Sequence, residues 1–110
     1  MNMETMVFSL ITHSGDARSS ALEAIAEAKK GNFEAAQAKL TQADEAASAA
    51  HKSQTELIQA EAGGEGVEIS LLLIHAQDHL MNAMTVRQLA EEIIDLHQRL
   101  AQDGATCTAV

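Results

Sequence analysis

Apolar side chains recur every three or four residues along three separate stretches of the chain, which is the period of an amphipathic α-helix. The three stretches are residues 3–30, 32–62 and 68–102. Glycine-containing segments separate them, and glycine is a poor residue for a helix interior. The pattern therefore predicts three helices in a single domain of 110 residues, followed by a polar tail over residues 103–110.

The first break, around residues 29–32, predicts a tight turn. Lys29 and Lys30 suit a helix C-terminus, Gly31 suits a left-handed cap and Asn32 can cap the helix that follows. The second break has three glycines between residues 63 and 66 and lacks the Lys of a phosphate-binding loop. We therefore expect an all-α fold, an antiparallel three-helix bundle.

The apolar stripes also predict the core. In the first two helices the expected core residues are Met3, Val7, Leu10, Ser14, Ala17, Ala21, Ala24, Ala28, Phe33, Ala36, Leu40, Ala43, Ala47, Ala50, Gln54 and Leu57. In the third they are Leu72, Ala76, His79, Ala83, Val86, Ala90, Ile93, His97 and Leu100. Many of these residues are alanine, which buries little area, so a bundle built from them gains stability by associating with other copies.

The first half of the third helix is apolar on more than one face. Its additional apolar residues are Leu71, Leu73, Ile74, Leu80, Met81 and Met84. A three-helix bundle alone cannot cover all of them, so we expect another subunit to do so. The outer side of the second half is expected to be polar and wet, because it carries Glu91, Glu92, Asp95, Gln98 and Arg99.

Charge narrows the range of partners. The chain has 16 acidic and 7 basic residues, a formal net charge of −9, and the basic residues are scattered. Nucleic acid is therefore not expected as a partner; the acidic surface favours basic protein surfaces, and it equally fits a role in solubility alone. The longest apolar run, Leu71 to Ile74, is too short to cross a bilayer. The N-terminus lacks a basic targeting segment and Cys107 is the single cysteine, so we expect a cytoplasmic protein without an intramolecular disulfide.

The candidate chemistry lies early in the third helix. His75, Asp78, His79 and Asn82 are spaced i, i+3, i+4 and i+7, so they share one side of that helix. Three interpretations are open from spacing alone: structural polar residues, a metal site or a nucleophilic histidine at a subunit interface. We assign structural roles to His13 and His97, and we expect His51 to be a boundary or surface side chain without a role.

A metal site would use His75 and His79, which can share an ion, with Asp78 in reach. Three ligands are too few for a closed structural zinc site, and the glutamate of an HExxH metalloprotease helix is absent. If three copies of Asp78 met on a symmetry axis, six oxygens could hold a hard cation such as Mg²⁺. The alternative function is thus a non-enzymatic helical oligomer that binds a divalent metal through His75, Asp78 and His79.

A nucleophilic site would use His75 as a neutral, accessible imidazole that accepts a phosphoryl group and gives it up again. Such a transfer depends on positioning and on stabilising the charge of the phosphoryl oxygens. Gln77 and His79 are the candidate donors to those oxygens.

Four segments resemble one known family, the IIA component of the lactose and N,N'-diacetylchitobiose (cellobiose) branch of the bacterial sugar phosphotransferase system. The segment from His75 to Met81 resembles the signature around that family's phosphorylated histidine. The other similar segments are Leu10–Ser19, Ala28–Phe33 and Glu91–Leu100. A histidine-phosphotransfer domain of two-component signalling fits less well, because no Lys-Gly pair follows the histidine shortly afterwards.

The resemblance implies a homotrimer with the active histidine in a groove between subunits. His75 would accept a phosphoryl group from the phosphocarrier HPr and pass it to a cysteine of the cognate IIB component. The membrane would be involved only through the IIC transporter, which takes up a disaccharide of the lactose, cellobiose or chitobiose class. Asp78 would lie near the threefold axis, where family members sometimes hold a divalent cation, and no other cofactor is implied.

Overall fold

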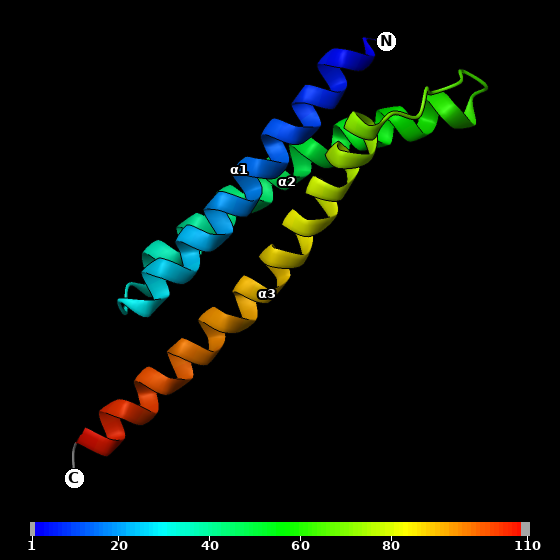
Figure 1. The fold of residues 1–110 in the computed structure, drawn as a ribbon. Helices are drawn as coiled ribbons and strands as arrows, with labels where there is room; N and C mark the ends of the chain where they lie inside the picture. The colour runs from blue at the N-terminus through cyan, green and yellow to red at the C-terminus, as the bar shows by residue number, and fades with distance from the viewer. Residues whose placement is uncertain (1, 109–110) are drawn as a thin grey trace.

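The structure is a computed structural model that describes residues 2–108, and it is an antiparallel three-helix bundle as expected (Figure 1). Its helices are α1 (Met3–Lys29), α2 (Phe33–Ala62) and α3 (Leu71–Thr108). α2 runs back along α1, and α3 then runs in the same general direction as α1 (Figure 1). The bundle is elongated, with extents of 67 × 21 × 16 Å.

The turn between α1 and α2 follows the predicted cap only in part. Gly31 adopts φ +83°, the left-handed conformation in which a side chain would be strained, and its N–H donates to the Ala28 carbonyl. The expected cap by Asn32 is wrong. Its side-chain amide instead donates to Glu27 Oε2 at 3.0 Å, so it ties the turn to the end of α1.

Both ends of α3 differ from the expected bounds. Its start moves from residue 68 to Leu71 because Ser70 forms a cap there, with its Oγ accepting from the Leu73 N–H at 3.1 Å. Its end moves from residue 102 to Thr108, so the expected polar tail is helical that far. That segment contains no proline, and its single Gly104 costs only about 1 kcal/mol relative to Ala. The Cys107 side chain and residues 109–110 lie outside the described part of the chain.

The buried core divides into two groups along the bundle. The large-residue cluster consists of Met6, Val7, Leu10, Ala50, Leu57, Leu73, Ala76 and Leu80. The alanine cluster consists of Ala21, Ala24, Ala28, Ala36, Leu40, Ala43, Ala90 and Ile94. On α1, Ser14 lies between the two; it is fully buried, and its hydroxyl has no hydrogen-bond partner among the described residues.

The inward face of α3 is rotated from the one predicted. Its buried residues are Leu73, Ala76, Leu80, Ala83, Ala90 and Ile94. Leu73, Leu80 and Ile94 thus take the places expected for Leu72, His79 and Ile93, and each observed residue lies one position later in the chain than the expected one. The rotation buries three large aliphatic side chains and leaves His79 half-buried. This is favourable because an aliphatic side chain gains more free energy than a histidine when it leaves water.

The opposite side of α3 carries a row of exposed apolar residues, which we call the outer stripe. Its members are Leu71, Ile74, Met81, Leu89, Leu96 and Leu100. Leu96 and Leu100 are 58% and 63% exposed, so the expectation of a polar outer side in the second half of this helix is wrong at these positions. Of the five polar residues expected outside, Glu91, Glu92 and Arg99 are exposed, whereas Asp95 and Gln98 are half-buried.

Polar cross-links join α3 to α2. Arg87 of α3 donates to both oxygens of Asp44 on α2, at 2.6 and 3.0 Å, and also to Glu91 one turn along its own helix. The hydrogen bond to Asp44 raises the pKa of Arg87 above its ordinary value, with a smaller contribution from Glu91 and a partly opposing effect of burial. Among the described residues, no helix has both the length and the hydropathy of a membrane span.

Candidate functional site

The first turns of α3 bring two imidazoles into contact. His75 Nε2 lies 3.1 Å from His79 Nε2, and the two rings meet edge to face with centroids 4.5 Å apart. His75 is exposed and His79 is half-buried. If both rings are neutral, one Nε2 donates a hydrogen and the other offers a lone pair, and the tautomers decide which. The contact therefore places a nitrogen that can donate beside the exposed imidazole of His75.

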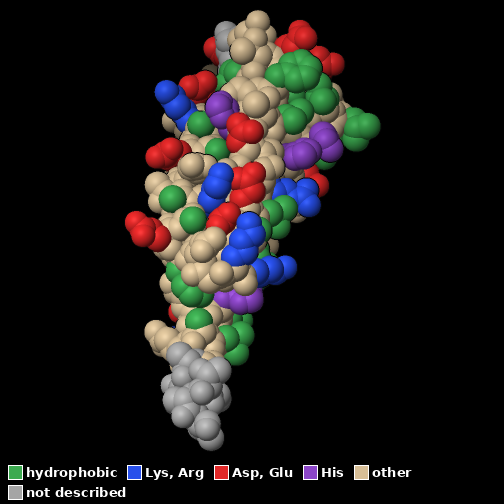
Figure 2. All heavy atoms as spheres, turned by 90° about the vertical axis from the view of Figure 1, so that its left-hand side faces the viewer, with side chains coloured by type: hydrophobic (Ala, Val, Ile, Leu, Met, Phe, Trp, Pro, Cys, Tyr) green, Lys and Arg blue, Asp and Glu red, His purple; other side chains and the backbone are tan. Residues whose placement is uncertain are grey.

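The core fixes the helix that carries this pair. Ala76 and Leu80, the residues that follow His75 and His79 in the chain, are both fully buried in the large-residue cluster. Exposed apolar residues of the outer stripe lie nearby on the same helix. Figure 2 shows hydrophobic side chains gathered toward the N-terminal end of the visible face, with histidine side chains beside them. The imidazoles are thus held by a rigid helix next to an apolar surface.

Asp78 lies apart from the imidazole pair. Its carboxylate is exposed and accepts a hydrogen bond from Asn82 Nδ2 at 3.4 Å, and it lies within the outer stripe. Among the side chains that the structure describes, no three metal-binding groups converge. The alternative of a metal held within one chain by His75, Asp78 and His79 is therefore not supported, because two of these ligands bond to each other and the third points elsewhere.

Gln77 occupies yet another side of α3. Its Oε1 accepts a hydrogen bond of 2.6 Å from Gln54 Nε2 on α2, and both side chains are half-buried. Residues two apart on a helix are separated by about 200°, so Gln77 faces away from His75 of its own chain. The apolar stripe of the second helix predicts Gln54 as a core residue but predicts no role for it. The available signal was a lone amide in an otherwise apolar stripe.

The other histidines lie outside this site. His13 and His97 are half-buried and His51 is exposed. His51 lines a shallow hollow between α2 and α3 together with Asp44, Ala47, Ser48 and Met84.

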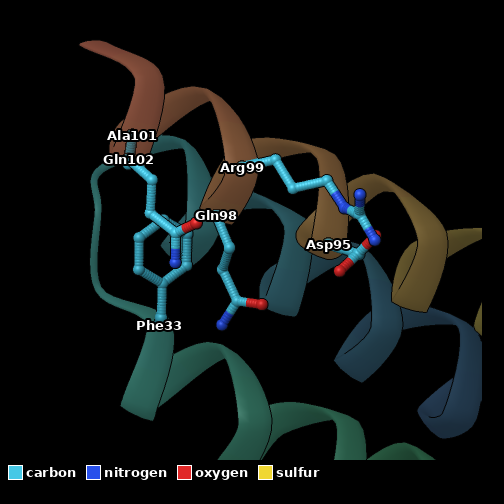
Figure 3. Close-up of a pocket in the computed structure, with 6 residues that line it drawn as sticks. All are labelled: Phe33, Asp95, Gln98, Arg99, Ala101 and Gln102. Carbon is cyan, nitrogen blue, oxygen red and sulfur yellow. The ribbon is translucent and has the colours of Figure 1, made fainter. Parts of the chain in front are cut away.

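A larger hollow, of about 660 Å³, lies at the far end of the bundle (Figure 3). It is lined by Phe33, Asp95, Gln98, Arg99, Ala101 and Gln102. Arg99 forms an ion pair with Asp95 at 2.9 Å across one turn of α3. At a helical rise of 1.5 Å per residue, this region lies about 30 Å from His75, so it is separate from the imidazole pair.

A family model described as "PTS system, Lactose/Cellobiose specific IIA subunit" matches residues 5–98. The lichenan-specific phosphotransferase enzyme IIA component of Bacillus subtilis (strain 168) is 57% identical over 105 residues, which is 94% of this chain and 96% of that protein. The N,N'-diacetylchitobiose-specific EIIA component of Escherichia coli (strain K12) is 47% identical over 98 residues, 89% of this chain and 84% of that protein.

Solved structures agree with this match. The cellobiose-specific enzyme IIA from Bacillus anthracis superposes with a TM-score of 0.89 at 54% identity, covering 93% of this chain and 94% of that one. A chain from the solution structures of the IIA(Chitobiose)–HPr complex superposes with a TM-score of 0.81 at 44% identity, covering 92% and 98%. This chain therefore belongs to the lactose/cellobiose-specific IIA subunits of the phosphotransferase system.

Proposed function

We propose that His75 is the phosphoryl carrier of this IIA subunit. It accepts the group from phospho-HPr and passes it to the cysteine of a cognate IIB component, for uptake and phosphorylation of a disaccharide of the lactose, cellobiose or chitobiose class. The observation that carries the proposal is the exposed imidazole of His75 with His79 Nε2 only 3.1 Å from its own Nε2. Membership of a phosphotransferase family and the HPr complex of a related IIA chain support it.

The transfer exchanges one nitrogen–phosphorus bond for another. The lone pair of His75 attacks phosphorus in line while the bond to the HPr histidine breaks, and the departing imidazole keeps the electron pair of that bond. Little covalent chemistry is needed from other groups, so positioning and charge stabilisation dominate. His79 is suited to that second role, because an N–H that donates to His75 before transfer can donate to a phosphoryl oxygen afterwards.

We propose further that the outer stripe of α3 packs against the same stripe of two other copies. Leu71, Leu89 and Leu96 together form an exposed apolar surface on a single helix, which a parallel arrangement of three copies would cover. This arrangement would bring three Asp78 carboxylates to the threefold axis. Their oxygens suit one divalent cation such as Mg²⁺, and without a cation their mutual repulsion destabilises the trimer.

The proposed role of Asp78 is tested by Asp78→Leu. Removing the buried like charges should raise the melting temperature of the trimer while His75 still accepts phosphate. Sedimentation and thermal melts, each with and without EDTA, provide the measurement. A lower melting temperature or dissociation of the variant would instead identify Asp78 as a required ligand or hydrogen-bond partner.

The proposed role of His75 is tested by intact mass. The protein is incubated with phosphoenolpyruvate, enzyme I and HPr, and His75→Ala is compared with the wild type and with His51→Ala as a matched control. We expect one acid-labile phosphoryl group per chain in the wild type and the control, and none in His75→Ala. An unmodified wild type, or a His75→Ala variant that still gains the group, would overturn the assignment.

A further inference from the structure

We propose that Gln54 is a positioning residue: it fixes the orientation of the Gln77 amide so that the amide nitrogen of Gln77 faces the phosphohistidine of a neighbouring protomer. The inference rests on the proposed function and on the proposed packing of α3. It assigns a role to a residue of α2, which carries none of the candidate chemistry.

Hydrogen bonding to Gln54 engages one end of the Gln77 amide. The Gln54 Nε2 donates to the Gln77 Oε1 at 2.6 Å, so the oxygen of the Gln77 amide is engaged. The Gln77 nitrogen keeps two N–H donors. With Gln54 in place, the donor end of Gln77 is thus the end left free for another partner.

The imidazoles and Gln77 lie on opposite sides of Asp78 around α3. Successive residues turn by about 100°, so His75 and His79 lie about 60° and 100° to one side of Asp78, and Gln77 lies about 100° to the other side. In a cyclic trimer the contact is heterologous, so one edge of each helix meets the opposite edge of its neighbour. With Asp78 at the axis, the imidazole edge of one protomer therefore faces the Gln77 edge of the next.

At that contact the Gln77 amide would meet the oxygens of the phosphoryl group. The oxygens of a phosphoryl group on histidine are hydrogen-bond acceptors, so they are stabilised by the amide nitrogen of Gln77 and repelled by its oxygen. Either orientation fits the same space, because the two ends of an amide have nearly the same shape. With Gln54 Nε2 as the donor, the hydrogen bond favours the orientation that leaves the Gln77 nitrogen free, and it does so before the phosphoryl group arrives.

The experiment compares Gln54→Ala with Gln54→Glu, using the rate of phosphoryl transfer to IIB and the lifetime of the phosphohistidine. A glutamate at this position can only accept, so it turns the Gln77 amide and presents its oxygen to the phosphoryl group. We expect transfer to slow about tenfold or more in Gln54→Glu and about two- to threefold in Gln54→Ala, in which the amide is free to turn. Gln59→Glu, which places the same charge at an exposed position of α2, should match the wild type.

A merely structural role gives the opposite order, because glutamate preserves the shape of glutamine and alanine does not. A greater loss in Gln54→Ala than in Gln54→Glu would therefore overturn the proposal. A direct charge effect is separated by adding Gln77→Ala: we expect Gln54→Glu to cause no further loss in that background. A further loss as large as in the wild-type background would overturn the proposal as well.

Mixed trimers test whether Gln77 acts across the interface. Protomers carrying His75→Ala retain Gln77, so in mixtures with Gln77→Ala protomers they should restore fast transfer at the remaining His75 sites. Unchanged slow transfer in the mixture would place Gln77 outside the neighbouring site. Wild-type protein that takes up no phosphoryl group would refute the proposed function instead, so the two failures are distinguishable.

Discussion

The two core clusters stabilise the same three helices in different ways. The large-residue cluster buries side chains such as Leu10, Leu57 and Leu80, so it gains free energy mainly from the apolar area removed from water. The alanine cluster has Leu40 and Ile94 as its only large members, and elsewhere it depends on close approach of the helix backbones. The first is therefore sensitive to the removal of a large side chain, whereas the second leaves little space for any added atom.

This difference follows the distribution of function along α3. His75 and His79 alternate with residues anchored in the large-residue cluster, where removal of one leucine is costly and the helix is held firmly. Beside the alanine cluster, α3 buries only a few side chains, such as Ala90 and Ile94, against the other helices of its own chain. Its leucines there, Leu89, Leu96 and Leu100, are exposed. The chemistry thus lies where the single chain is well packed, and the surface available for association extends to where it is not.

The largest expected effect is in the large-residue cluster. Leu10→Ala removes a fully buried side chain and leaves a cavity, so we expect it to lower the free energy of unfolding by about 2–5 kcal/mol. Urea denaturation at fixed protein concentration measures the loss, and Leu22→Ala, at a half-exposed position of α1, is the control. If Leu10→Ala lost less free energy of unfolding than Leu22→Ala, the large-residue cluster would not be the main source of stability.

The alanine cluster is tested in the opposite direction, by enlarging a side chain. Ala24 is fully buried where α1 packs on the other helices, so we expect Ala24→Leu to destabilise the protein by about 1–3 kcal/mol through overpacking. Ala26→Leu, on the exposed side of the same helix, should change stability by less than about 0.5 kcal/mol. Equal melting temperatures for the two variants would contradict close helix approach in this cluster.

The predicted and observed helices show what the period of a sequence can determine. The buried residues of α1 and α2 largely match the predicted stripes, because in each helix the alanines of one face are clearly separated from the polar residues of the other. In α3 apolar residues lie on two opposite faces, so several faces had similar hydrophobicity and the predicted one was rotated toward His79. Packing in the large-residue cluster, which also contains Val7 and Leu57, favours Leu73 and Leu80 over their neighbours.

The candidate site shows a similar division. The i, i+4 spacing predicts that His75 and His79 lie side by side, and the structure brings their Nε2 atoms to 3.1 Å. The partner of Gln77 could not be predicted, because it lies 23 residues away on another helix. Such a pairing depends on how two helices align along their length, which the period of either helix alone does not specify.

Ser14 marks the boundary between the clusters and gives the next prediction. Its buried hydroxyl has no hydrogen-bond partner in the part of the chain that the structure describes, so replacing Ser14 with alanine removes a desolvation cost and adds helix propensity. We expect Ser14→Ala to raise the free energy of unfolding by about 1 kcal/mol. Ser19→Ala, exposed on α1, measures the propensity contribution alone. If the free energy of unfolding rose equally in the two variants, burial of the Ser14 hydroxyl would have no free-energy cost.

The smallest expected effect concerns Arg87, which joins α3 to α2 through Asp44 near the alanine cluster. Both acidic partners are more than half exposed, so Arg87→Met should cost only about 0.2–1 kcal/mol despite the bidentate geometry. The pKa of Arg87 is raised in the folded protein, so its contribution to the free energy of unfolding is complete below the ordinary pKa of arginine and is lost only when the pH rises above that pKa. The difference in stability between Arg87→Met and the wild type should therefore stay constant from about pH 6 to 9. Thermal melts at several pH values measure this, with Arg99→Met as the control for an ion pair within one helix. A loss of several kcal/mol would mean that polar cross-links, rather than backbone approach, hold α3 at this end of the bundle.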